Sequence, residues 1–67
     1  MIGRFWRQYR RNLDIRLLWP ECKAAADEAG LGLDGARAAF MMHAANDPAW
    51  TKDYTERELQ IIIGALP

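Results

Sequence analysis

In the first thirteen residues, apolar and basic side chains are interleaved at the spacing of an α-helix. With successive residues placed about 100° apart, the apolar side chains fall within one arc roughly 100° wide; they are Ile2, Phe5, Trp6, Tyr9 and Leu13. Arginines occupy the other sides, and no acid precedes Asp14. The pattern predicts a basic amphipathic helix over about residues 2–12, with its aromatic face in the core and its arginine face outside.

A second helical pattern runs from Ile15 to Ala29, where apolar residues recur at i, i+3, i+7, i+10 and i+14. The first stripe loses register after Leu13, so the chain is predicted to bend near Asn12 and Asp14. Asp14 then has the position and the side chain of an N-cap for the second helix.

Pro20 falls inside this second pattern. Proline removes one backbone donor and restricts the residue before it, so a regular helix readily begins at Pro20 but does not pass through it unchanged. The element is therefore either kinked at Trp19 or begins at Pro20, and we expect a regular helix over residues 20–29 preceded by a helical stretch over residues 14–18.

A third helix is predicted from its ends. Gly30 is a natural C-cap for the second helix, and Asp34 is the expected N-cap of a helix that runs to about Asn46. This helix is apolar nearly all round, with Arg37 as its one Lys or Arg residue. It is therefore predicted to be the buried centre of the fold.

The last third of the chain carries two further start signals. Asp47 stands before a proline, which predicts a short helical turn through Trp50. Thr55 and Glu58 form the pattern of a capping box, followed by an apolar stripe. The last helix is predicted over about residues 56–64.

These patterns predict one all-α domain over residues 1–67, a compact bundle of three or four short helices. With 67 residues the chain lies below the roughly 70–80 at which a single core comfortably supports itself, and its one cysteine, Cys22, excludes an intrachain disulfide. Aromatic packing, an oligomer interface or a permanent partner must add stability. The predicted core is Phe5, Trp6, Tyr9, Leu13, Leu18, Phe40, Leu59, Ile62 and Ile63.

The net charge of zero conceals a strong asymmetry. Residues 1–16 carry five arginines against one aspartate, +5 − 1 = +4, and residues 17–67 carry four basic against eight acidic residues, +4 − 8 = −4. This layout suits an N-terminal face that docks on an acidic partner. It equally suits two copies that pack head to tail, or a helix that bridges to acidic neighbours in its own chain.

Residues 25–34 resemble the centre of a helix-turn-helix motif. Ala26 precedes Gly30 by four residues, and the apolar Leu31 follows the glycine. A recognition helix needs polar side chains for base edges in the major groove, yet the helix that follows offers only Arg37 and His43. We therefore interpret the segment as an αα-hairpin.

Candidate chemistry is sparse. His43 and Asp47 stand four residues apart, and Cys22 is a possible third ligand from the second helix. A metal site needs three or four convergent ligands, and no pair with the spacing of CxxC or HExxH occurs. We expect no catalytic site, no metal and no cofactor, with His43 favoured near its helix C-terminus by the helix dipole.

The leading functional hypothesis is a small non-enzymatic protein-interaction module. It docks the arginine-rich helix on an acidic or phosphate-bearing surface of a larger assembly, a character typical of phage and mobile-element accessory or inhibitor proteins. One alternative is sequence-independent binding of nucleic acid through phosphates, and another is a structural homodimer. The chain is expected to be cytoplasmic, without a membrane partner. The predicted binding residues are Arg4, Arg7, Arg10, Arg11 and Arg16.

Overall fold

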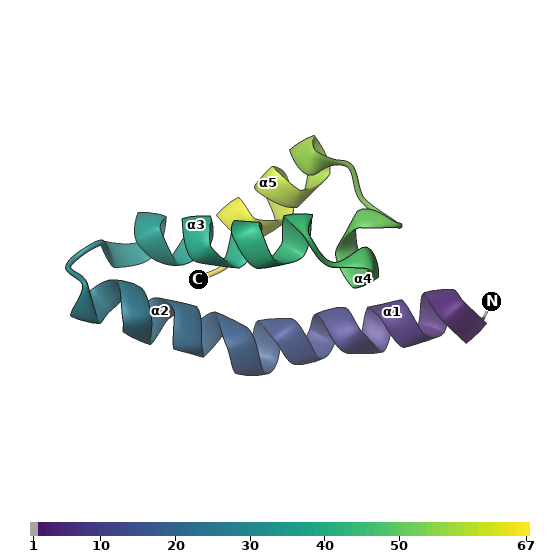
Figure 1. Cartoon of the computed structure of the whole chain (residues 1–67), viewed down its shortest axis with the longest axis horizontal. Helices are drawn as coiled ribbons and strands as arrows, with labels where there is room; N and C mark the ends of the chain where they lie inside the picture. Colours follow the sequence, from purple (N-terminus) through teal and green to yellow (C-terminus); the bar gives the residue numbers. More distant parts are fainter. Residues whose placement is uncertain (1) are drawn as a thin grey trace.

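A computed structural model describes the chain from residue 2 onward, with side chains from Gly3. All regular elements of this part are helical, and the fold is the predicted small all-α bundle. One long helix lies under a layer of three shorter ones (Figure 1). The elements are α1 (Ile2–Leu13), the π-helical segment η1 (Asp14–Leu18), α2 (Trp19–Glu28), α3 (Gly32–Ala45), α4 (Pro48–Thr51) and α5 (Glu56–Gly64).

The first two predicted helices form one continuous helix, so the predicted bend and the N-cap role of Asp14 are wrong. The wider π-helical turn of η1 joins them, and the Trp19 N–H donates to the Asp14 carbonyl five residues back. Pro20 follows in the first turn of α2, where the regular hydrogen-bond ladder is already interrupted. The helix therefore accommodates the proline without a break in the chain direction (Figure 1).

The extra residue in η1 also explains the register change after Leu13. It turns Trp19, which is 3% exposed, to the same side as the buried Arg11. On the opposite side, Leu17 is 60% exposed and continues the row begun by Tyr9. The long helix therefore keeps one covered side and one open side along its length.

The αα-hairpin predicted between the second and third helices is confirmed. Gly30 and Gly32 have φ values of 75° and 65°, a left-handed conformation that favours glycine. The Leu31 N–H donates to the Ala26 carbonyl at 2.8 Å and closes the turn. The N-cap assignment of Asp34 is wrong, because α3 begins at Gly32 and the Asp34 side chain is fully exposed.

The capping signals of the last two helices are confirmed. The Asp47 side chain accepts a hydrogen bond from the Ala49 N–H at 2.9 Å and begins α4. Thr55 and Glu58 bond reciprocally at 3.2 and 3.0 Å and begin α5. Hydrogen bonding from Thr55 to the Glu58 carboxyl, chiefly from the Thr55 backbone N–H, lowers the pKa of that carboxyl.

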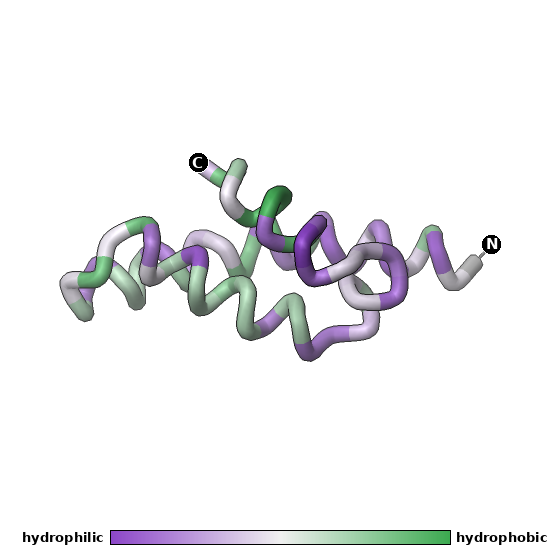
Figure 2. The backbone as a smooth tube through the Cα atoms, turned by 90° about the horizontal axis from the view of Figure 1, so that it is seen from above, coloured by the Kyte–Doolittle hydropathy of each residue, from purple (hydrophilic) through white to green (hydrophobic). Residues whose placement is uncertain are grey.

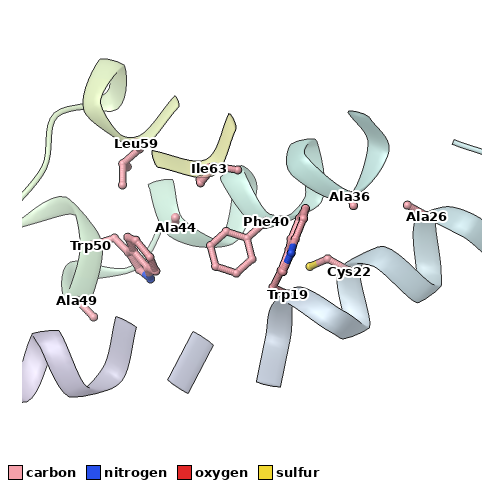
Figure 3. Packing of buried hydrophobic residues seen from close by; sticks show 10 residues of the cluster. All are labelled: Trp19, Cys22, Ala26, Ala36, Phe40, Ala44, Ala49, Trp50, Leu59 and Ile63. Atoms are coloured by element: carbon pink, nitrogen blue, oxygen red, sulfur yellow. The ribbon is translucent and has the colours of Figure 1, made fainter. Parts of the chain in front are cut away.

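The hydrophobic core lies between α2, α3, α4 and α5. Phe40 occupies its centre, with the rings of Trp19 and Trp50 edge-on at centroid distances of 5.8 and 5.7 Å. The predicted burial of Phe40, Leu59 and Ile63 is confirmed. Figure 3 shows the cluster, which comprises Trp19, Cys22, Ala26, Ala36, Phe40, Ala44, Ala49, Trp50, Leu59 and Ile63.

The predicted core position of the α1 aromatics is wrong. Phe5, Trp6 and Tyr9 are 81%, 64% and 54% exposed. Arg7, Arg10 and Arg11 of the arginine face are instead directed toward the polar segment that contains α4 and leads into α5, where they pair with acids. Figure 2 shows that both the N-terminal half of the long helix and this segment are mostly hydrophilic. The helix is amphipathic as predicted, but its orientation is reversed.

Candidate functional site

Two arginines of α1 hold one aspartate just after α4. Arg7 donates to both carboxylate oxygens of Asp53 at 3.0 Å, and Arg11 donates to Oδ2 at 2.6 Å. These hydrogen bonds lower the pKa of Asp53 to about 2, and they raise the pKa of Arg7. Asp53 therefore stays ionised and fixes α1 against the segment after α4.

Arg11 is the most buried arginine of the helix, at 4% exposure. Its guanidinium also donates to the Ala49 carbonyl and to the Gln8 side chain, both at 2.7 Å, and lies 5.1 Å from the centroid of the Tyr54 ring. A buried cation is tolerated only with such partners. Arg11 is therefore a structural residue.

A second polar cluster lies where η1 meets α3 and α4. The buried Asp14 accepts hydrogen bonds at Oδ2 from Trp50 Nε1 at 2.8 Å and pairs with His43 Nε2 at 3.0 Å. His43 Nε2 also lies 3.5 Å from Asp47, and Arg10 donates to Asp47 at 3.2 Å. These contacts join the long helix to the end of α3.

The same cluster has the residue types of a metal site. One ligand atom each of Asp14, His43 and Asp47 lies within 4.8 Å of the others. However, Trp50 donates to Asp14 and Arg10 donates to Asp47, so both carboxylates already have donors from the protein. The cluster is satisfied as a hydrogen-bonded connection between elements, without requiring an ion.

Cys22 does not join this cluster. Its side chain lies in the hydrophobic core, and burial raises the pKa of its thiol, with a smaller effect from Glu21. The convergence considered for Cys22, His43 and Asp47 is replaced by that of Asp14, His43 and Asp47. The sequence pattern around Asp14 did not indicate this cluster, because it predicted that Asp14 caps a helix.

The five arginines predicted to bind a partner divide into two groups. Arg7, Arg10 and Arg11 are paired with acids of their own chain, as one interpretation of the charge asymmetry anticipated. Arg4 and Arg16 are exposed. Partner binding by these five residues stays a prediction, and it now depends mainly on Arg4, Arg16 and the half-exposed Arg10.

A row of apolar side chains lies on the open side of the long helix, although the sequence pattern predicted most of them to be in the core. We call this row the outward stripe; it consists of the exposed Phe5, Trp6, Tyr9 and Leu17 and the half-buried Leu13. The rings of Trp6 and Tyr9 lie together, with their centroids 5.8 Å apart. In Figure 1, α3, α4 and α5 all lie on one side of the long helix, and no helix of the described residues lies on its opposite side.

The three aromatic side chains make this stripe large for so small a protein. An aromatic side chain offers about 150–250 Å². At the exposures of Phe5, Trp6 and Tyr9, they together present on the order of 400 Å² of surface. The largest apolar patch on a typical monomer covers about 300–600 Å² and is often functional. The sequence did contain a signal for the exposure of these aromatics: Asp47 and Asp53, the acids that pair with the arginines of α1.

The comparisons with known proteins leave the function to be argued from these residues. No family model, no curated protein and no solved structure matches the chain. Among the helices of residues 2–67, none combines the length and apolar character needed to cross a bilayer.

The Asp53 carboxylate predicts how stability depends on pH. Its pKa in the folded protein, about 2, lies below its usual value of 3.8. The stability that Asp53 contributes is therefore fully present above its usual pKa and is lost as the pH falls toward 2. Urea unfolding at a series of pH values is expected to show a loss of stability in that range.

The matched variant is Asp53→Asn, which cannot titrate. Its stability is expected to fall less steeply than that of the parent between pH 4 and 2. If parent and variant have the same pH dependence, the ion pairs of Arg7 and Arg11 with Asp53 do not form in solution.

Proposed function

We propose that the protein is a non-enzymatic protein-interaction module of the cytoplasm that docks the outward stripe of its long helix on a protein partner. The observation that carries this proposal is the exposure of Phe5, Trp6 and Tyr9 on a helix whose Arg7 and Arg11 are turned inward. Aromatic side chains supply most of the binding energy in many interfaces.

The polar contacts behind the helix support this proposal, because they make the stripe rigid. Arg7 and Arg11 hold α1 at Asp53, and Asp14 holds η1 at Trp50. A surface that is already ordered in the free protein loses less conformational entropy when it binds. Arg4 and Arg16 are exposed and stay the candidates for contact with acids of a partner.

A site-specific photo-crosslinking experiment tests this proposal. A photoreactive phenylalanine analogue replaces Phe5, which is 81% exposed, in cells that express the full chain. The matched control places the same analogue at Ile61 of α5, which is 66% exposed. We expect a discrete protein adduct from position 5 and none of the same mass from position 61.

Three results would contradict the proposal. Equal adducts from both positions would indicate unspecific hydrophobic contact, and no adduct from position 5 would indicate that the stripe is unoccupied. An adduct with nucleic acid would favour the alternative of phosphate binding, for which Arg4 and Arg16 are the exposed candidates.

A further inference from the structure

We infer that the outward stripe is covered by a second copy of this chain, packed antiparallel through the long helix. This inference rests on the proposed function, because it names the partner that the stripe accepts. Three features of the stripe carry it: its spacing, the charge beside it, and its area.

The spacing of the stripe is self-complementary. Phe5, Tyr9, Leu13 and Leu17 follow one another at four-residue steps, with the two aromatic residues at one end and the two leucines at the other. A two-fold axis midway between Tyr9 and Leu13 places Phe5 against Leu17 of the second copy, and Tyr9 against Leu13. Each large ring then packs on a smaller branched side chain, whereas a parallel pair would set like residues against each other.

The charge beside the stripe also favours a second copy. Near the axis the neighbouring side chains on one flank are the neutral Gln8 and Asn12, which bond to each other at 3.1 Å. On the other flank is Arg10, whose charge is paired with Asp47 at 3.2 Å. The arginines on the other side of α1, Arg7 and Arg11, are paired with acids of their own chain. Because Asp47 neutralises the half-exposed Arg10 beside the stripe, two copies approach without strong repulsion between like charges.

The exposed area is enough for a specific pair. The aromatic side chains of two copies contribute on the order of 800 Å². Leu17 and the half-buried Leu13 of each copy bring the total to about 1,000 Å², the size of the smallest biological interfaces and below the roughly 1,200–2,000 Å² of standard stable ones, so the pair associates weakly. A chain of 67 residues also needs stabilisation beyond its own core.

Sedimentation equilibrium of the full chain over about 1–500 μM is the first test. We expect the mass to rise from 7.7 kDa toward 2 × 7.7 = 15.4 kDa. Tyr9→Glu places one carboxylate on each side of the axis, and we expect it to weaken association at least about 100-fold. The control is Met42→Glu, at a position that is 72% exposed on α3, and it is expected to associate as the parent does.

Spin labels test the antiparallel arrangement. One label replaces Asn12 beside the axis, and in a separate variant one label replaces Arg4; the buried Cys22 is left in place. With a rise of about 1.5 Å per residue, antiparallel packing separates the two Arg4 labels by about 20 Å along the helix and the two Asn12 labels by about 3 Å. Parallel packing would give similar distances for both pairs.

Each other outcome overturns the inference. A chain that stays at 7.7 kDa over the whole range has no second copy on the stripe. Association that survives Tyr9→Glu uses another surface, and equal label distances exclude the antiparallel pair. Failure of the second-copy inference is distinguishable from failure of the proposed function. If the chain is a monomer but still gives a protein adduct from position 5, the stripe binds a partner other than a second copy.

Discussion

Phe40→Ala is expected to leave the protein largely unfolded. The side chain is fully buried between the rings of Trp19 and Trp50, so its removal opens a cavity that the surrounding residues cannot fill. Truncating a buried phenylalanine costs about 3–5 kcal/mol. A small domain has a total stability near the low end of about 5–15 kcal/mol. Thermal unfolding followed by circular dichroism measures the effect.

The control for this variant is Met42→Ala on the same helix. Met42 is 72% exposed, and its truncation is expected to change stability by less than about 0.5 kcal/mol. If Phe40→Ala melts as the parent does, α3 is not the centre of the core.

Arg11→Ala is expected to destabilise the protein by about 2–3 kcal/mol, although arginine is usually a surface residue. The change removes the donor to the buried Ala49 carbonyl and one of two cations on Asp53. It also removes the guanidinium beside the Tyr54 ring. Urea unfolding at neutral pH measures the loss.

Arg4→Ala is the matched control, because Arg4 is exposed on the same helix. Its effect on unfolding is expected to stay within about 0.5 kcal/mol. Equal effects of the two substitutions would mean that the arginine face of α1 is solvated, as the sequence analysis predicted.

The elements that the sequence predicts correctly are those with local signals. The capping box of Thr55 and Glu58, the N-cap at Asp47 and the turn at Gly30 depend on side chains or conformations within a few residues of each other. The burial of Phe40 follows from its place in the most apolar helix. These features require no knowledge of the partner elements.

The orientation of α1 was not predictable from periodicity. The spacing of Phe5, Trp6 and Tyr9 identifies an apolar face but not the direction in which that face points. The direction is set by Asp53, which lies 46 residues after Arg7 and 42 after Arg11. An ion pair between residues so far apart in the sequence does not appear in the helical periodicity of either segment.

The π-helical turn was not predictable for a related reason. The register change after Leu13 and the presence of Pro20 are each typical of a broken helix. The one extra residue in the π-helical turn of η1 accounts for the register change and accommodates the proline, and the helix stays continuous. The same turn places Asp14 among Trp50, His43 and Arg10, so a buried residue that joins three helices was predicted to be a helix cap.

Oxidative footprinting of the tryptophans tests the orientation of the long helix most directly. Trp6 is 64% exposed, whereas Trp19 and Trp50 are 3% and 1% exposed. In brief hydroxyl-radical labelling of a dilute sample, where association is negligible, mass spectrometry is expected to find Trp6 oxidised much faster than the other two. Protection of Trp6 equal to that of Trp19 and Trp50 would place the aromatic face of α1 in the core and contradict the account.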